Sequence, residues 1–294
     1  MPPFELTLVL LSGLLHAVWN AATKGSGTPT GFLMAIELVS LAVFVPILIL
    51  GFDPGEVPPA VWRLLVASAV IHAFYGYWLT RAYAHTELSI AYPIVRSTPA
   101  LVPFIAVPFL GESLSIPGGI GIALVVISLW MVTRDGRLDA AAFRSRGARF
   151  AYLALATTVA YSLVDKEGMR LLGEAPWSGP LPRAVIFMAL MYALYLPLFA
   201  LLARRSIGVA DVVAVLRKRS ALVMASAAVA FLSYVLILQA MVTAPVSYIT
   251  AVRQSSILFA LALAFFALRE RPGRMRLLGV LANVAGVALI ALSR

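Results

Sequence analysis

Residues 89–133 read SIAYPIVRSTPALVPFIAVPFLGESLSIPGGIGIALVVISLWMVT. Two apolar segments meet at Gly111-Glu112, the first interrupted by prolines and the second opened by glycines. Each segment is about 20 residues long, enough to cross the roughly 30 Å hydrocarbon core of a bilayer as a helix. The stretch therefore predicts a transmembrane hairpin that turns over a single glutamate.

The same pattern returns between residues 247 and 291, close to the C-terminus. One unbroken shift of the chain aligns four polar or glycine pairs: Ser89 with Ser247, Ser97 with Ser255, Glu112 with Glu270, and Gly121 with Gly279. Alanine and leucine matches carry little information in an apolar chain, but these residue types are less common. We interpret the match as an internal repeat.

The composition indicates a membrane protein. Of the 294 residues, 62% are apolar and 12% are charged, whereas about 25% are charged in a typical soluble protein. The chain has no cysteine, so disulfides and thiolate metal sites are excluded. Ten membrane spans are predicted, near residues 4–23, 31–51, 61–83, 89–110, 117–133, 149–166, 183–203, 220–240, 247–268 and 275–292.

The net charge of +10 does not indicate a nucleic-acid partner, because the basic residues lie in the loops between spans. Most of them lie in odd-numbered loops and in the linker after the fifth span. The positive-inside rule then places that linker in the cytoplasm and both termini outside.

Five spans in each repeat is an odd number, so the second repeat starts from the opposite side of the membrane. We therefore predict an all-α integral membrane protein whose ten transmembrane helices form two inverted five-helix repeats. The predicted units are residues 1–136, a basic linker at 137–148, and residues 149–294. Secondary transporters with this symmetry bind substrate near the midplane, where the repeats meet.

Several spans carry polar and aromatic residues that are candidates for a substrate cavity. In the first span, His16, Trp19 and Asn20 share one helix face. Aromatic side chains can form a cage for an amphiphilic ligand or belong to the interface belts. The further candidates for substrate contacts are Tyr75, Trp78, Tyr92, Tyr161, Tyr234, Tyr248 and Gln254.

Arg96 and Arg253 lie well inside their spans, at corresponding depths in the two repeats. Arginine can hold a substrate carboxylate through two parallel hydrogen bonds. The alternatives are an ion pair with Glu37, which lies inside the second span, or snorkelling to the membrane surface. A carboxylate such as Glu37 is costly in a membrane unless it is paired, protonated or facing water.

Two other features have a structural and a functional interpretation. Glu112 and Glu270 are kept by the repeat, and we expect each to cap the hairpin after its helix. His16 is a candidate proton carrier because its side chain titrates near neutral pH, or it forms a hydrogen bond across a helix interface.

The prolines of the fourth span predict an irregular helix. Pro93, Pro99, Pro103 and Pro108 each remove a backbone donor. We expect this span to be bent or locally unwound and to line the transport path, since freed carbonyls must face protein or water. The ninth span has no internal proline, so the two halves are expected to bend differently.

These features resemble the drug/metabolite transporter superfamily, in particular its bacterial EamA-type ten-span members. The likeness covers nearly the whole chain and includes the glycine-opened fifth and tenth spans. The motifs that carry it are His16-Ala17-Val18-Trp19-Asn20 leading to Lys24, its echo at Tyr161-Ser162 and Lys166, and Gly111-Glu112 with its echo at Arg269-Glu270.

The resemblance implies an inverted-repeat exporter or carrier of small metabolites in a bacterial inner membrane, with amino acids and related compounds as frequent substrates. It also implies cytoplasmic termini, in conflict with the charge pattern. Four-span multidrug relatives place a glutamate in the first span, where this chain has His16 and Asn20, so their proton–drug antiport cannot simply be copied.

We therefore expect a secondary transporter or facilitator that moves amino acids or similar metabolites by alternating access, as a monomer or homodimer. Proton coupling through Glu37 or His16 and uncoupled facilitation are both open. The alternatives are a flippase for lipid-linked or other amphiphilic substrates and an uptake carrier for another small organic anion. An enzyme is not expected, because the three histidines lie on different segments and no serine has a partner base nearby. No cofactor or metal is expected.

Overall fold

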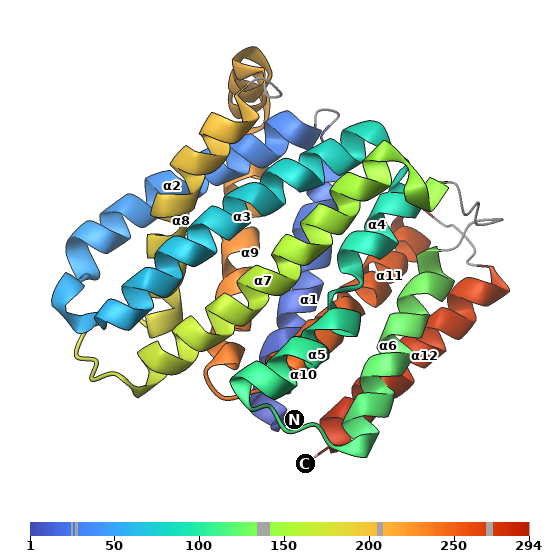
Figure 1. The fold of residues 1–294 in the computed structure, drawn as a ribbon. Coiled ribbons are helices and arrows are strands. Elements are labelled where there is room, and N and C mark those ends of the chain that lie inside the picture. Colours follow the sequence, from blue (N-terminus) through green and yellow to red (C-terminus); the bar gives the residue numbers. More distant parts are fainter. Residues whose placement is uncertain (25, 27–28, 134–141, 205–207, 269–272, 294) are drawn as a thin grey trace.

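The structure is a computed structural model, which describes residues 1–24, 26, 29–133, 142–204, 208–268 and 273–293 (Figure 1). The regular secondary structure of these residues is helical. The first half contains α1 (Pro3–Lys24), α2 (Pro29–Gly51), η1 (Pro54–Glu56), α3 (Pro59–His85), α4 (Leu88–Arg96), α5 (Thr98–Leu110) and α6 (Ile116–Thr133). The second half contains η2 (Ala142–Arg144), α7 (Arg146–Glu174), α8 (Arg183–Ala203), α9 (Val209–Met241), α10 (Val246–Val252), η3 (Arg253–Ser255), α11 (Ser256–Leu268) and α12 (Arg274–Leu292).

Among the described residues, 8 helices are long and apolar enough to cross a membrane. Two shorter apolar helices, Ile116–Val132 and Val246–Ala262, fall on the predicted fifth and ninth spans. The chain is therefore an integral, multi-pass, all-helical membrane protein. Its outer surface agrees with lipid contact, because large apolar side chains such as Phe104, Phe109 and Ile116 are about four-fifths exposed.

Two predicted spans are too short. The sixth was expected at 149–166, but α7 runs over Arg146–Glu174, and its first turn is capped by the Ser145 hydroxyl, which accepts a hydrogen bond from the Ala148 amide. The eighth was expected at 220–240, but α9 begins at Val209 and has non-helical dihedral angles at Arg219. Polar residues at these ends continue the helices, because a helix need not stop where the hydrocarbon layer stops.

Small residues bring α6 and α12 together at one edge of the molecule (Figure 1). A side-chain Cβ on Gly121 would lie 2.6 Å from the carbonyl oxygen of Gly286, and one on Gly286 would lie 2.6 Å from the carbonyl oxygen of Gly121. Nearby, the Asn283 amide donates to the Ser128 hydroxyl at 2.9 Å. Close backbone contact through glycine is a frequent way to pack helices where lipid supplies little hydrophobic driving force.

The two chain ends lie close together at one end of the molecule (Figure 1). The Met1 amino group donates to the carbonyls of Ile290, at 3.0 Å, and Ser293, at 2.5 Å. In the interior, α3 packs along α7 and α1 packs along α9. Helix α4 packs on α7 and α3, and α10 packs on α1 and α9, so these helices bring their polar residues toward one another.

Candidate substrate site

Both of the spans that carry the buried arginines are interrupted at the arginine. Helix α4 ends at Arg96, Ser97 leaves helical geometry with φ −74° and ψ 14°, and α5 starts at Thr98. Helix α10 ends at Val252, and a 3₁₀ turn at Arg253–Ser255 precedes α11. The predicted irregularity of the fourth span is confirmed.

The ninth span is also irregular, although it has no internal proline. Around its break the Thr250 hydroxyl donates to the Ser247 carbonyl at 3.1 Å, and the Gln254 amide donates to the Thr250 carbonyl at 3.3 Å. Such side chains compete with the backbone for helical carbonyls. The two spans differ in the form of the break, as expected, but the absence of proline did not keep the ninth span regular.

Arg96 lies at the centre of a half-buried polar cluster. Its guanidinium donates through Nη2 to Nε2 of His16 at 2.6 Å and through Nη1 to the Ser256 hydroxyl at 3.2 Å. The ring of Tyr92 lies 5.2 Å below the guanidinium carbon, within range of a cation–π interaction. Because Nε2 of His16 accepts, its ring proton is assigned to Nδ1.

Arg253 approaches the same interior from the second half of the chain. Its guanidinium carbon lies 5.3 Å from the centre of the Tyr234 ring, and its Nε is buried without a hydrogen-bond partner. In the part of the chain that the structure describes, neither Arg96 nor Arg253 has a carboxylate within salt-bridge distance. Glu37, the alternative partner considered for them, is hydrogen-bonded to Tyr192.

A second, more deeply buried cluster surrounds Asp165 of α7. Its Oδ1 accepts from the Ser68 hydroxyl at 2.5 Å, and its Oδ2 accepts from the Tyr234 hydroxyl at 2.5 Å. Nε2 of His72 lies 3.9 Å from Oδ2. The Tyr161 ring stacks on His72 with centroids 3.9 Å apart and meets Tyr75 edge-on at 5.5 Å. The aromatic candidates Tyr75, Tyr161 and Tyr234 thus lie between the two clusters.

Other predicted site residues have different surroundings. Trp78 stacks on Phe150, with ring centroids 5.7 Å apart. The Asn20 amide bonds to its own helix, at the His16 carbonyl, over 2.7 Å, and Trp19 meets the His16 ring edge-on. Gln254 keeps a buried Oε1 without a hydrogen-bond partner.

Glu112 does not simply cap its own hairpin. Gly111 adopts the left-handed conformation, with φ 67°, and the following Glu112 side chain reaches the first turn of α10. It accepts hydrogen bonds from the amides of Val246 and Ser247, and from the Ser247 hydroxyl at 2.6 Å. The predicted counterpart Glu270 lies outside the described residues.

Tyr248 joins this contact between the two halves and does not reach the arginine clusters. Its hydroxyl accepts a hydrogen bond from the Ser115 amide at 3.1 Å. Nearby, the Lys166 ammonium donates to the carbonyls of Met241, at 2.7 Å, and Ala244, at 2.9 Å. Together these bonds attach the start of α10 to the α5–α6 turn, and the end of α9 and the α9–α10 connection to α7.

Residues 3–134 match the EamA-like transporter family. This match covers a little under half of the chain and ends at the close of the first predicted repeat. A solved crystal structure with 17% sequence identity superimposes with a TM-score of 0.73 over 98% of both chains, which extends the fold likeness to the second half. The comparison with curated proteins gave no significant match. The family consists of membrane transporters of small molecules.

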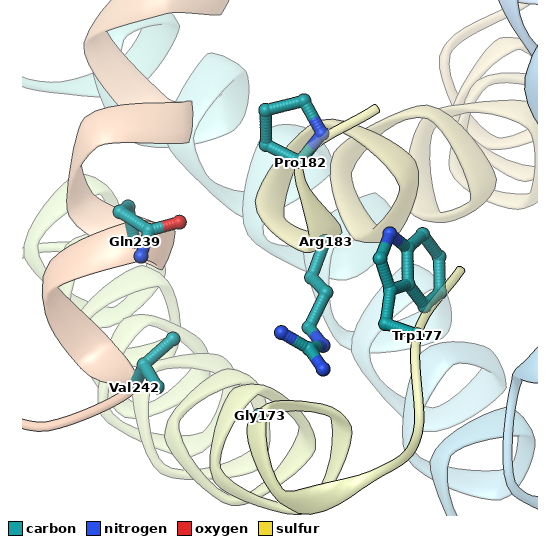
Figure 2. Close-up of a pocket in the computed structure, with 6 residues that line it drawn as sticks. All are labelled: Gly173, Trp177, Pro182, Arg183, Gln239 and Val242. Carbon is teal, nitrogen blue, oxygen red and sulfur yellow. The ribbon is translucent and has the colours of Figure 1, made fainter. Parts of the chain in front are cut away.

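A separate small pocket of the EamA-like chain lies between the end of α7, the start of α8 and the end of α9 (Figure 2). Its volume is about 190 Å³, and it is lined by Gly173, Trp177, Pro182, Arg183, Gln239 and Val242. The Arg183 guanidinium donates to the Ala175 carbonyl at 2.7 Å and lies over the Trp177 ring. None of its lining residues belongs to the two central clusters, so we do not assign the substrate site here.

Several residues that complete the two clusters were not predicted from the sequence: Asp165, Ser68, His72 and Ser256. Asp165 lies on the polar face of the sixth span, and an acid inside a membrane span is itself a signal of function. The partners Ser68 and Ser256 carry no comparable signal, because serine is common in membrane helices.

Proposed function

We propose that this protein is a secondary carrier that exports small metabolites with a carboxylate group, amino acids or related compounds in particular, across a bacterial inner membrane by alternating access. One observation carries the proposal. Two guanidinium groups, Arg96 and Arg253, enter the interior at the two helix breaks, and no carboxylate among the described residues lies within salt-bridge distance of either. A cation inside a membrane span without an opposite charge nearby is costly unless a ligand supplies that charge.

The chemistry of the arginines favours a carboxylate. Guanidinium groups match carboxylate oxygens with parallel hydrogen bonds. Immediately after each arginine a new helix begins, α5 at Thr98 and α11 at Ser256, and the positive ends of such half-helices favour anionic substrate groups. Tyr75, Tyr92 and Tyr161 would then contact the remainder of the substrate, with His16 adding a hydrogen bond.

Alternating access is supported by reciprocal packing. Helix α1 packs on α9 as α7 packs on α3, and α2 packs on α9 as α8 packs on α3. This exchange of partners is what a two-fold relation between residues 1–136 and 149–294 requires. It supports an arrangement of ten spans as two inverted five-helix repeats, whose relative rocking would expose the central clusters to each side in turn.

Counterflow in proteoliposomes loaded with a panel of labelled amino acids tests the proposal. We expect saturable exchange in the wild type and about 100-fold weaker exchange in Arg96→Ala, because two charge-assisted hydrogen bonds to a carboxylate contribute about 3 kcal/mol. Arg170→Ala is the matched control, since Arg170 pairs with Glu167 and Glu174 at the protein surface. Its exchange should equal that of the wild type.

Equal exchange in Arg96→Ala and Arg170→Ala would contradict a carboxylate site at Arg96. If the inserted, folded wild type exchanged no amino acid, the amino-acid assignment would be wrong. The same panel extended to other small carboxylates would then decide whether the arginines bind an organic anion at all.

A further inference from the structure

Asp165 is a fully buried acid whose hydrogen-bond partners are all neutral. Its exposed fraction is 0%, and both oxygens accept from hydroxyl groups, those of Ser68 and Tyr234. A lone carboxylate in a membrane interior is strongly disfavoured. It persists where a cation or a proton can compensate its charge.

His72 of α3 lies in position to supply a positive charge opposite the Asp165 carboxylate. Its Nδ1 lies 3.0 Å from the backbone carbonyl of Ser68, so this nitrogen carries a proton and donates. Nε2 then has a free lone pair in the neutral ring, 3.9 Å from Oδ2 of Asp165 and 3.4 Å from the Tyr234 hydroxyl.

The cluster has fewer donated protons than hydrogen-bond acceptors. The Tyr234 hydroxyl lies between two acceptors, Oδ2 of Asp165 at 2.5 Å and Nε2 of His72 at 3.4 Å, and it has one proton to donate. The Ser68 hydroxyl proton goes to Oδ1 of Asp165. Nε2 is therefore left without a donor, and a proton added there would turn a buried anion into a hydrogen-bonded ion pair.

Among the described residues, the other titratable groups nearby make no hydrogen bond or ion pair with Asp165. Tyr161 of α7 stacks on His72, and Tyr195 of α8 meets His72 edge-on. The guanidinium of Arg253 in η3 lies over the Tyr234 ring, whose hydroxyl donates to the carboxylate. From α4, Arg96 donates to His16 and Ser256.

We propose that Asp165, His72 and Tyr234 form a binding site for one transported proton, separate from the arginines and coupled to them through Tyr234. The proton comes from water on one side of the membrane and adds to Nε2 of His72, which gives an imidazolium opposite the Asp165 carboxylate. It leaves to water on the other side when the site separates. This inference rests on the proposed carrier function.

The placement of the site explains how a proton could be coupled to substrate. His72 and Ser68 belong to α3 in the first half, whereas Asp165 and Tyr234 belong to α7 and α9 in the second half. A movement of α3 relative to α7 and α9 would lengthen the Ser68–Asp165 and Tyr234–His72 contacts. The proton strengthens the attraction across this contact, and a substrate anion at Arg253 would change the field at Tyr234.

The transport test uses proteoliposomes with a trapped pH-sensitive dye and the amino acid that exchanges best. We expect an inward or outward amino-acid gradient to move protons in the wild type. Asp165→Asn should still exchange the amino acid but move protons at less than about one-tenth of the wild-type rate. Glu167→Gln, two positions further along α7 and paired with surface Arg170, is the matched control and should move protons normally.

Proton movement by Asp165→Asn at the wild-type rate would overturn the proposal. Wild-type exchange without proton movement would also overturn it while leaving the carrier function intact. If the wild type exchanges nothing, the carrier function fails, and the proton site is decided by a measurement without substrate.

That measurement is nitrogen NMR of ¹⁵N-histidine-labelled protein, with the His72 signal assigned from its loss in His72→Gln. We expect the His72 ring to gain a proton at Nε2 on acidification in the wild type. Asp165→Asn should require about a tenfold higher proton concentration, because an opposite charge within about 4–6 Å favours the charged ring. Identical titrations in the two proteins would overturn the site.

Discussion

Arg96 and Arg253 are half-buried cations with no carboxylate in salt-bridge distance among the described residues, whereas Asp165 is a fully buried acid held by two hydroxyl groups. Tyr234 lies between Arg253 and Asp165. Its ring faces the Arg253 guanidinium and its hydroxyl binds Asp165. A purely structural ion pair would place these opposite charges in direct contact. The Tyr234 ring separates Arg253 from Asp165, and this separation is what the proposed anion site and the proposed proton site require.

The largest loss of stability is expected away from both charged clusters, at the uncharged contact between α6 and α12. Gly121→Leu should lower the free energy of unfolding by about 3 kcal/mol, because overpacking a tight contact costs this much, and here the new side chain meets the backbone of Gly286. Thermal unfolding in detergent measures the loss. Gly119→Leu is the control, because no atom lies within 4 Å of a Cβ at Gly119. A loss of similar size in both variants would show that the α6–α12 contact is not tight.

A smaller effect is expected where the two clusters meet. Tyr234→Phe keeps the ring over which Arg253 lies and removes the hydroxyl that donates to Asp165. Leaving a buried acceptor unsatisfied should cost about 2 kcal/mol of unfolding free energy, and substrate-driven proton movement should fall while affinity for the amino acid changes little. Tyr152→Phe, at an exposed position of α7, serves as the control. Unchanged stability and proton movement in Tyr234→Phe would contradict the proposal that Tyr234 couples the proton site to the arginines.

The smallest effect concerns the ring beneath Arg96. Tyr92→Ala should weaken amino-acid binding about fivefold, since a partly desolvated cation–π contact contributes about 1 kcal/mol. Tyr92→Phe keeps the ring and should bind like the wild type. Binding to the purified protein by isothermal titration calorimetry distinguishes the two. Equal weakening in both variants would assign the effect to the Tyr92 hydroxyl and not to the ring.

The helical, membrane-spanning character of the chain and the places of most membrane helices could be predicted from the sequence, because hydropathy and length depend on local composition. The irregular fourth span followed from its prolines in the same way. The 3₁₀ turn of the ninth span at Arg253–Ser255 was not predicted, because no proline marks it in the sequence. The ends of α7 and α9 were also missed, because helices continue beyond the apolar segment.

The site was predictable in part. Arg96, His16 and Tyr92 were named from their depth and helix face, and they meet in one cluster. Tyr248 and Glu112 were also named from sequence, but they belong to the contact that attaches α10 to the first half. Position along a helix indicates the depth of a residue in the membrane, but not which neighbouring helix it faces.

The amino-acid sequence by itself determined that this chain is a helical membrane protein with arginines and acids inside its spans, because each of these properties is a matter of local composition. Which side chains form hydrogen bonds with these arginines and acids depends on how the helices pack in the tertiary structure. Arg96 meets His16 from 80 positions away, and Asp165 meets Ser68 from 97 positions away. The physical reason is that helix–helix contacts in a membrane depend on the shapes and polar groups of both surfaces, and so no single segment encodes them.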